Sequence, residues 1–206
     1  MSMVNAPYGL RPVKRADGLP YAGATSQYLI NPAGTATNIF NGSVVNLDSN
    51  GYIVLSTATG ADATTNALPA GTTLTGSLGV FVGCEYVNAQ GQLIFSQYYP
   101  ASYAAPTGTS IKAYVVDDPN VLFQAQLDGS VAQTALGTNT FFAAVQSTST
   151  GNTATGNSTS ALESTVVTTT AAFRIVGIVS ASGDTYGEVL VKFNPGYHSL
   201  TNAVGL

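Results

Sequence analysis

The segment LGVFVGCEYVNAQGQLIFSQYY (residues 78–99) indicates the fold of this chain more clearly than any other stretch. Valine, isoleucine, phenylalanine and tyrosine dominate its two halves, and these residue types are enriched in β-strands. The halves flank Asn88-Ala89-Gln90-Gly91, where asparagine and glycine favour a tight turn. The segment therefore predicts two strands joined by a short turn.

The same pattern recurs on both sides of this segment. Residues 43–47 and 52–57 flank Asp48-Ser49-Asn50-Gly51, and Asn-Gly accepts positive φ at low cost, so a second hairpin is expected. A further turn is predicted at Asp118-Pro119-Asn120. Strands are also expected at 26–31, 110–117, 121–127, 141–146, 171–180 and 188–194.

Helix signals are weak by comparison. Residues 130–136 could form two turns of helix, and Ser160 with Glu163 matches a capping box. Many short strands with little helix predict an all-β fold, with a small jelly-roll, sandwich or barrel body. We expect this body to cover residues 26–206. Two long polar loops within it, near 57–73 and 146–160, are predicted to be mobile, and the second has no apolar residue larger than alanine.

Composition narrows the functional classes. Charged residues make up 8% of the 206 residues, against about 25% in an ordinary soluble domain. Such a surface repels other proteins weakly and is typical of shells and coats. The net charge of −4 argues against a general nucleic-acid binder. No apolar run approaches the roughly 18 residues of a membrane span, and the N-terminus shows no apolar signal-peptide core. We therefore expect no membrane partner and, from the net charge, no nucleic-acid partner.

Residues that could carry catalysis are few. Cys84 lies in an apolar strand pattern and is predicted to be a buried small hydrophobe. His198, the only histidine, is expected to be a C-terminal contact or a surface residue. Asp117 and Asp118 precede a proline and an asparagine, which favours turn chemistry over a catalytic pair. We therefore expect no enzyme, no cofactor, no catalytic residue and no metal site.

Half of the positive charge gathers near the N-terminus. The stretch PYGLRPVKRADGLPY (residues 7–21) holds three of the six cations in the chain, and its three prolines oppose helix. Residues 1–25 are therefore predicted to form an extended arm, either as a flexible terminus or as a docking arm for an acidic partner surface. On the docking interpretation, removal of residues 1–20 should leave the body folded. The candidate docking residues are Tyr8, Leu10, Arg11, Lys14, Arg15 and Tyr21.

Several short stretches resemble a known group of proteins. Residues 5–13, together with Asp17-Gly18 and Tyr21-x-Gly23-Ala24-Thr25, look like the opening of tailed-phage structural proteins encoded among the head genes. Those proteins are regarded as capsid decoration, or cement, proteins. Four further stretches resemble that group: residues 114–119 and 123–129 resemble its middle section, and residues 174–178 and 189–192 resemble its closing strands.

The resemblance implies a role in the virion. Proteins of that kind sit on the outer surface of the head, often as homotrimers, and bridge neighbouring capsomers. The expected partners are thus the major capsid protein and further copies of this chain, which would be made in the cytoplasm of a bacterial host. Two alternatives remain at this point: a phage fibre or receptor-binding protein for a host glycan, and a virion enzyme that degrades polysaccharide.

Overall fold

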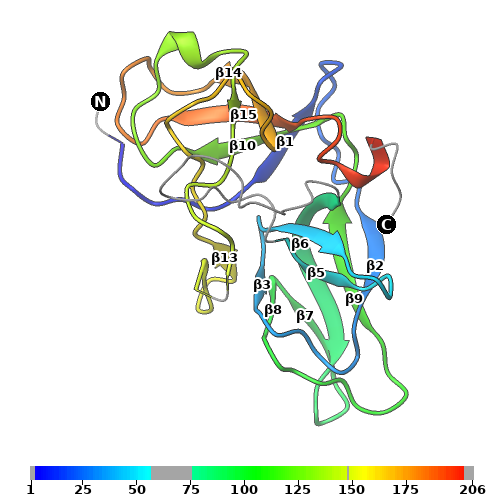
Figure 1. The fold of residues 1–206 in the computed structure, drawn as a ribbon. Helices are drawn as coiled ribbons and strands as arrows, with labels where there is room; N and C mark the ends of the chain where they lie inside the picture. Colours follow the sequence, from blue (N-terminus) through cyan, green and yellow to red (C-terminus); the bar gives the residue numbers. More distant parts are fainter. Residues whose placement is uncertain (1–2, 57–75, 148, 202–206) are drawn as a thin grey trace.

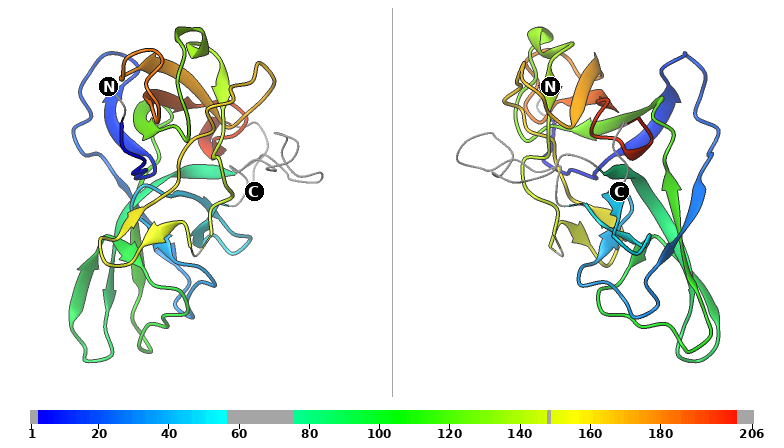
Figure 2. Two further views of the ribbon diagram at one scale, coloured as in Figure 1. Left: turned by 90° about the vertical axis from the view of Figure 1, so that its left-hand side faces the viewer. Right: turned by 45° about the vertical axis from the view of Figure 1, so that its right-hand side comes forward.

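The computed structural model describes residues 3–56, 76–147 and 149–201, and the predicted loop at 57–73 lies outside them. Nearly all regular secondary structure in the described residues is β-strand, and the strands pair antiparallel, which confirms the all-β prediction. Two main sheets lie at opposite ends of the molecule (Figures 1 and 2). Each sheet has its own hydrophobic core.

The first sheet has five strands in the order β1-β10-β15-β14-β11. Its inner face carries an aromatic cluster, in which the rings of Phe123 and Phe193 meet edge to face with centroids 5.6 Å apart. Phe173 continues this cluster, with its ring centroid 5.1 Å from that of Phe193. The strands are β1 (Arg11–Arg15), β10 (Val121–Gln126), β15 (Glu188–Phe193), β14 (Phe173–Ile178) and β11 (Asn139–Thr140).

The second sheet has the order β2-β9-β6-β4-β5. Strand β7 pairs with the C-terminal half of β6, on the same side of β6 as β4, which pairs with its N-terminal half. Both hairpins predicted from Asn-x-x-Gly and Asn-Gly turns are present, as β6–β7 and β4–β5. The strands are β2 (Ser26–Ile30), β9 (Ile111–Val116), β6 (Ser77–Val87), β4 (Val44–Leu47), β5 (Ile53–Leu55) and β7 (Leu93–Ser96).

Neighbouring residues of the second sheet belong to different cores. Val44 packs in the core of the first sheet, whereas Val45 packs in the core of the second. Val80 and Phe81 divide in the same way, as the two faces of a strand require. One face of the second sheet thus packs in its own core, and one end of the other face, with Val44 and Val80, packs in the core of the first sheet. This shared core joins the two halves of the molecule.

The turn at Asp118 is confirmed, but it does not close a hairpin. The Asp118 carboxylate accepts a hydrogen bond from the backbone N–H of Asn120 at 2.8 Å, as expected for a turn aspartate. Strand β9, which precedes the turn, pairs with β2 and β6, whereas β10, which follows it, pairs with β1 and β15. The turn thus carries the chain from one sheet to the other.

The N-terminal arm predicted from residues 1–25 is not separate from the body. Residues 11–15 form β1, an edge strand that pairs antiparallel with β10. Proline is tolerated there because an edge strand leaves one row of N–H groups unpaired. Leu10 is 1% exposed and belongs to the core of the first sheet. The extended backbone that the prolines predict is therefore present, but this part of the chain is an edge strand of the first sheet and not an arm that projects from the body.

The predicted mobile loop at 146–160 is also built into the fold. It contains the short hairpin β12 (Gly151–Asn152) and β13 (Asn157–Ser158), and Ser158 is 1% exposed. Gln146, at its start, is buried and both donates to and accepts from the backbone of Val44. Hydroxyls and amides, rather than large apolar side chains, provide the contacts that order this segment.

Three smaller predictions need correction. Residues 130–136 form only the 3-10 turn η1 (Gln133–Ala135), and no helix follows Ser160. The strand expected at 141–146 is absent, and the short β11 lies just before it. A second 3-10 turn, η2 (Ser199–Thr201), and the strand pair β3 (Ile39–Phe40) and β8 (Tyr98–Tyr99) complete the described elements.

Candidate functional site

Residues 4–8 lie against the outer face of the first sheet, on the side away from its core. The side chain of Gln126 donates a hydrogen bond to the carbonyl of Val4 (3.0 Å) and accepts one from the N–H of Ala6 (2.9 Å). Gln126 is only 3% exposed, so this reciprocal pair satisfies a buried amide. The N-terminal segment is thereby held beside β10, where Figure 1 shows it in blue.

Two glycines then bring this segment into contact with β3 and β4. Gly9 and Gly42 have φ angles of 75° and 89°, in the left-handed region that favours glycine. A Cβ atom on Gly9 would lie 2.5 Å from the carbonyl oxygen of Gly42, and one on Gly42 would lie 2.6 Å from that of Tyr8. The close approach lets the N–H of Leu10 donate to the Gly42 carbonyl at 2.9 Å.

A carboxylate on β15 fixes Tyr8, and the ring of Tyr8 in turn contacts Arg11. The hydroxyl of Tyr8 donates to one oxygen of Glu188 (3.0 Å), and the amide of Gln124 donates to the other (2.6 Å). Burial, together with the negative charge of Glu188, raises the pKa of the Tyr8 phenol well above its usual value, so the phenol remains a donor. The guanidinium of Arg11 lies 4.6 Å from the centre of the Tyr8 ring, in cation–π contact.

A row of cations crosses the outer face of the first sheet next to this network. The strand register places Lys14 opposite Leu122, and Arg174 opposite Lys192. Because Phe123 pairs with Val191 on the adjoining strands, Leu122 is opposite Lys192. Lys14, Lys192 and Arg174 thus share one row over four adjacent strands. Since strands lie about 4.8 Å apart, the row spans roughly 14 Å.

These cations lack carboxylate partners. Lys192 donates to the amide oxygen of Asn120 (3.3 Å), and Arg174 donates to that of Asn139 (3.2 Å). Within the described ranges, neither these two nor Arg11 nor Lys14 forms an ion pair. Like charges directly opposite each other destabilise a sheet. We call Arg11, Lys14, Lys192 and Arg174 the cationic face; it holds four of the six cations of a chain whose net charge is −4.

The structure sorts the predicted docking residues into three groups. Arg11 and Lys14 are exposed on the cationic face, and Tyr8 supports Arg11. Arg15 is neutralised by Asp17 at 3.2 Å and Asp118 at 3.5 Å. Tyr21 is half-buried and donates to the carbonyl of Ala24, and Leu10 is corrected to a core residue.

Sequence reasoning missed Lys192 and Arg174. Both occupy polar positions between buried residues of predicted strands, as in FRI and VKF, so alternation indicated that they face away from the core. Nothing in the sequence indicated that they share a row with Lys14. That fact required the register of β1, β10, β15 and β14.

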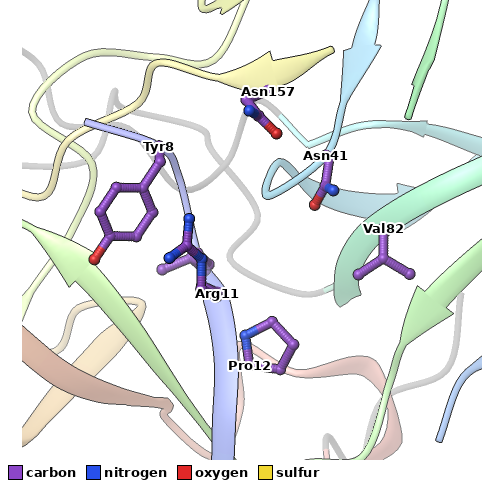
Figure 3. Close-up of a pocket in the computed structure, with 7 residues that line it drawn as sticks. Tyr8, Arg11, Pro12, Asn41, Val82 and Asn157 are labelled. Carbon is purple, nitrogen blue, oxygen red and sulfur yellow. The ribbon is translucent and has the colours of Figure 1, made fainter. Parts of the chain in front are cut away.

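A small pocket adjoins Arg11, at the point where β1 passes β3 and the hairpin β12–β13. It has a volume of about 260 Å³. Figure 3 shows the guanidinium of Arg11 between the Tyr8 ring and the side chains of Asn41 and Asn157. The pocket is lined by Tyr8, Leu10, Arg11, Pro12, Asn41, Val82 and Asn157.

The outer face of the second sheet combines exposed apolar side chains with one ion pair. Register places Leu29, Lys112, Glu85 and Phe95 in one row over β2, β9, β6 and β7. Phe95 is 70% exposed, and Leu93 on the same edge strand is 56% exposed. At the centre of the row, Lys112 and Glu85 form an ion pair of 2.7 Å. Exposed aromatic side chains such as Phe95 are of a type enriched at protein–protein interfaces.

Groups with catalytic potential are buried in the cores. Burial raises the pKa of the Cys84 thiol to about 12, as expected for the predicted small hydrophobe. His198 is 1% exposed and packs against Phe193, so it is a C-terminal contact and not a surface residue. Burial lowers the pKa of its imidazole. Among the described residues, no cluster of three metal-ligating side chains occurs, and no helix is long and apolar enough to span a membrane.

Comparisons with protein-family models, with curated proteins and with solved structures find no match to this chain. The geometry of its own surfaces is therefore the basis for the functional proposal.

Proposed function

We propose that this protein is a structural, non-enzymatic component of a phage head that binds the outer surface of the capsid and stabilises it by bridging neighbouring capsomers. The observation that carries the proposal is the cationic face. Four cations without carboxylate partners lie on one face of an otherwise acidic chain. Such a face is complementary to an acidic surface, which we assign to the major capsid protein.

The integration of the N-terminal segment into the sheet supports docking by a rigid surface. An arm that ordered only on contact would lose conformational entropy, which weakens association. Here β1 is already paired with β10, and Arg11 is already held over the Tyr8 ring. The resemblance of residues 5–13 to cement proteins supports the same partner.

A direct test is co-sedimentation with expanded capsid shells that lack this protein. We expect it to pellet with shells at a saturating stoichiometry and to dissociate as salt rises from about 0.1 to 1 M, because the Debye length falls from about 10 to about 3 Å. If no binding is seen at low salt, the proposal is wrong. A specific signal on a glycan array would then favour the fibre or receptor-binding alternative.

We further propose that the chain forms a homotrimer through the outer face of the second sheet. A second copy suits this face because it offers exposed apolar side chains around the Lys112–Glu85 pair, which presents both signs of charge. Cores of interfaces are enriched in aromatic residues. Phe95, the most exposed aromatic side chain of this face, is the expected anchor.

Phe95→Ser should therefore weaken self-association. Loss of an aromatic anchor costs about 2 kcal/mol, which corresponds to a roughly 30-fold higher dissociation constant. Sedimentation equilibrium measures this change. Leu136→Ser is a matched control, because Leu136 is 47% exposed but lies beside η1, outside this face. Equal behaviour of the two variants would contradict the assignment of the interface.

A further inference from the structure

The pocket beside β1 combines one held cation with two amide groups. The guanidinium of Arg11 stacks on the Tyr8 ring, and no hydrogen bond or ion pair joins it to any other described side chain. Glu188, the carboxylate of this network, already accepts from Tyr8 and Gln124. Arg11 therefore presents its N–H donors to whatever enters the pocket.

Asn41 and Asn157 are held next to each other by their backbones. The two residues form an isolated parallel bridge. The N–H of Asn41 donates to the carbonyl of Gly156 (3.0 Å), and the N–H of Ser158 donates to the carbonyl of Asn41 (2.8 Å). Within the described part of the chain, their side-chain amides form no hydrogen bond, although both line the pocket. Each amide offers two donors.

The opposite wall is apolar and the space is small. Pro12 and Val82 line it, and the volume of about 260 Å³ is below the range of about 300–1,000 Å³ for drug-sized ligands. The pocket therefore suits a single side chain better than a cofactor. Methylene groups would lie against Pro12 and Val82, and the polar end would meet Arg11, as the arrangement of side chains in Figure 3 indicates.

We infer that this pocket binds the carboxylate of a glutamate or aspartate side chain presented by a partner protein. A guanidinium is a planar fork that matches a carboxylate in two parallel hydrogen bonds. The guanidinium and the two neutral amides together supply one positive charge, which matches the single negative charge of a carboxylate. A phosphate dianion carries two negative charges and would require a second cation. The identity of the partner as the capsid surface rests on the proposed function, but the carboxylate site does not.

The site is tested on the full chain without any capsid. N-acetyl-glutamate amide is titrated into labelled protein, and the ¹⁵N signals of the Asn41 and Asn157 side chains and of Arg11 Nε are followed. We expect saturable shifts at these three groups, and at least a tenfold weaker response to N-acetyl-glutamine amide, which has the same shape without the charge. No saturable shift, or equal shifts with both probes, would overturn the inference.

Two variants separate the pocket from general charge. Arg11→Gln should abolish the response, whereas Lys14→Gln, which removes the same charge from the same strand outside the pocket, should retain it. Both positions are exposed, and matching thermal unfolding curves would show that each variant folds. A retained response in Arg11→Gln would overturn the assignment of Arg11.

Capsid binding distinguishes this inference from the proposed function. Arg11→Gln should weaken binding to shells at least tenfold more than Lys14→Gln does. Equal weakening would overturn the pocket as the point of partner contact. If the unchanged protein fails to bind shells, the proposed function fails, while the carboxylate site is still judged by the titration alone.

Discussion

Deleting residues 1–20 is expected to unfold this protein and not merely to remove a dispensable arm. The deletion removes β1 from the edge of the first sheet and leaves the β10 backbone without one of its two partner strands. It also removes Leu10 from the core and takes away the hydrogen-bond partners of the buried amide of Gln126. Each intramolecular hydrogen bond lost in this way costs about 0.5–1.5 kcal/mol.

The single substitution Leu10→Ala isolates the core contribution. Loss of a fully buried leucine costs about 2–5 kcal/mol, a large share of the roughly 5–15 kcal/mol that stabilises a typical domain. Urea unfolding followed by circular dichroism should show a clearly lower midpoint. Val4→Ala, at a side chain that is 79% exposed, should change the midpoint little.

Either of two results would contradict this account of the N-terminal segment. One is an unfolding midpoint for residues 21–206 equal to that of the full chain. The other is an effect of Leu10→Ala no larger than that of Val4→Ala. Both would indicate an arm that is independent of the body, as the prolines and cations of residues 7–21 suggest at the level of sequence.

Neutralising the row of cations should remove most of the capsid affinity. The triple variant Lys14→Gln, Lys192→Gln and Arg174→Gln is expected to bind shells roughly a hundredfold more weakly, a loss of about 3 kcal/mol shared among three charge contacts. Its stability should be equal or slightly higher, because Lys192 and Arg174 no longer face each other as like charges. Co-sedimentation at low salt measures the first effect and urea unfolding the second.

A control with the same change in net charge tests whether position matters. Three exposed glutamines outside the cationic face can be replaced by glutamate, which also lowers the net charge by three. This control should bind shells far better than the triple variant. If both variants lose affinity equally, attraction depends on the total charge and the cationic face is not the contact surface. The control substitutions are Gln27→Glu, Gln90→Glu and Gln133→Glu.

The sequence by itself determined the all-β class, the turns and the burial of Cys84. Each of these can be read from patterns in short stretches of sequence, namely β-branched and aromatic runs, turn residues and an apolar strand pattern around Cys84. The turn at Asn88–Gly91 is an example, because the Asn88 side chain accepts hydrogen bonds from the N–H groups of Gln90 and Gln92. A turn whose hydrogen bonds join residues only a few positions apart can be recognised from the sequence without knowledge of the rest of the fold.

Only the tertiary structure decided the features that bear on function. Residues 11–15 looked like a free arm because nothing local indicates a partner strand that lies more than a hundred residues away. The cationic face likewise depends on the register of four strands, and the pocket on a bridge between Asn41 and Asn157. Backbone pairing between distant segments depends on the burial of their side chains in a shared core, which only the folded chain creates.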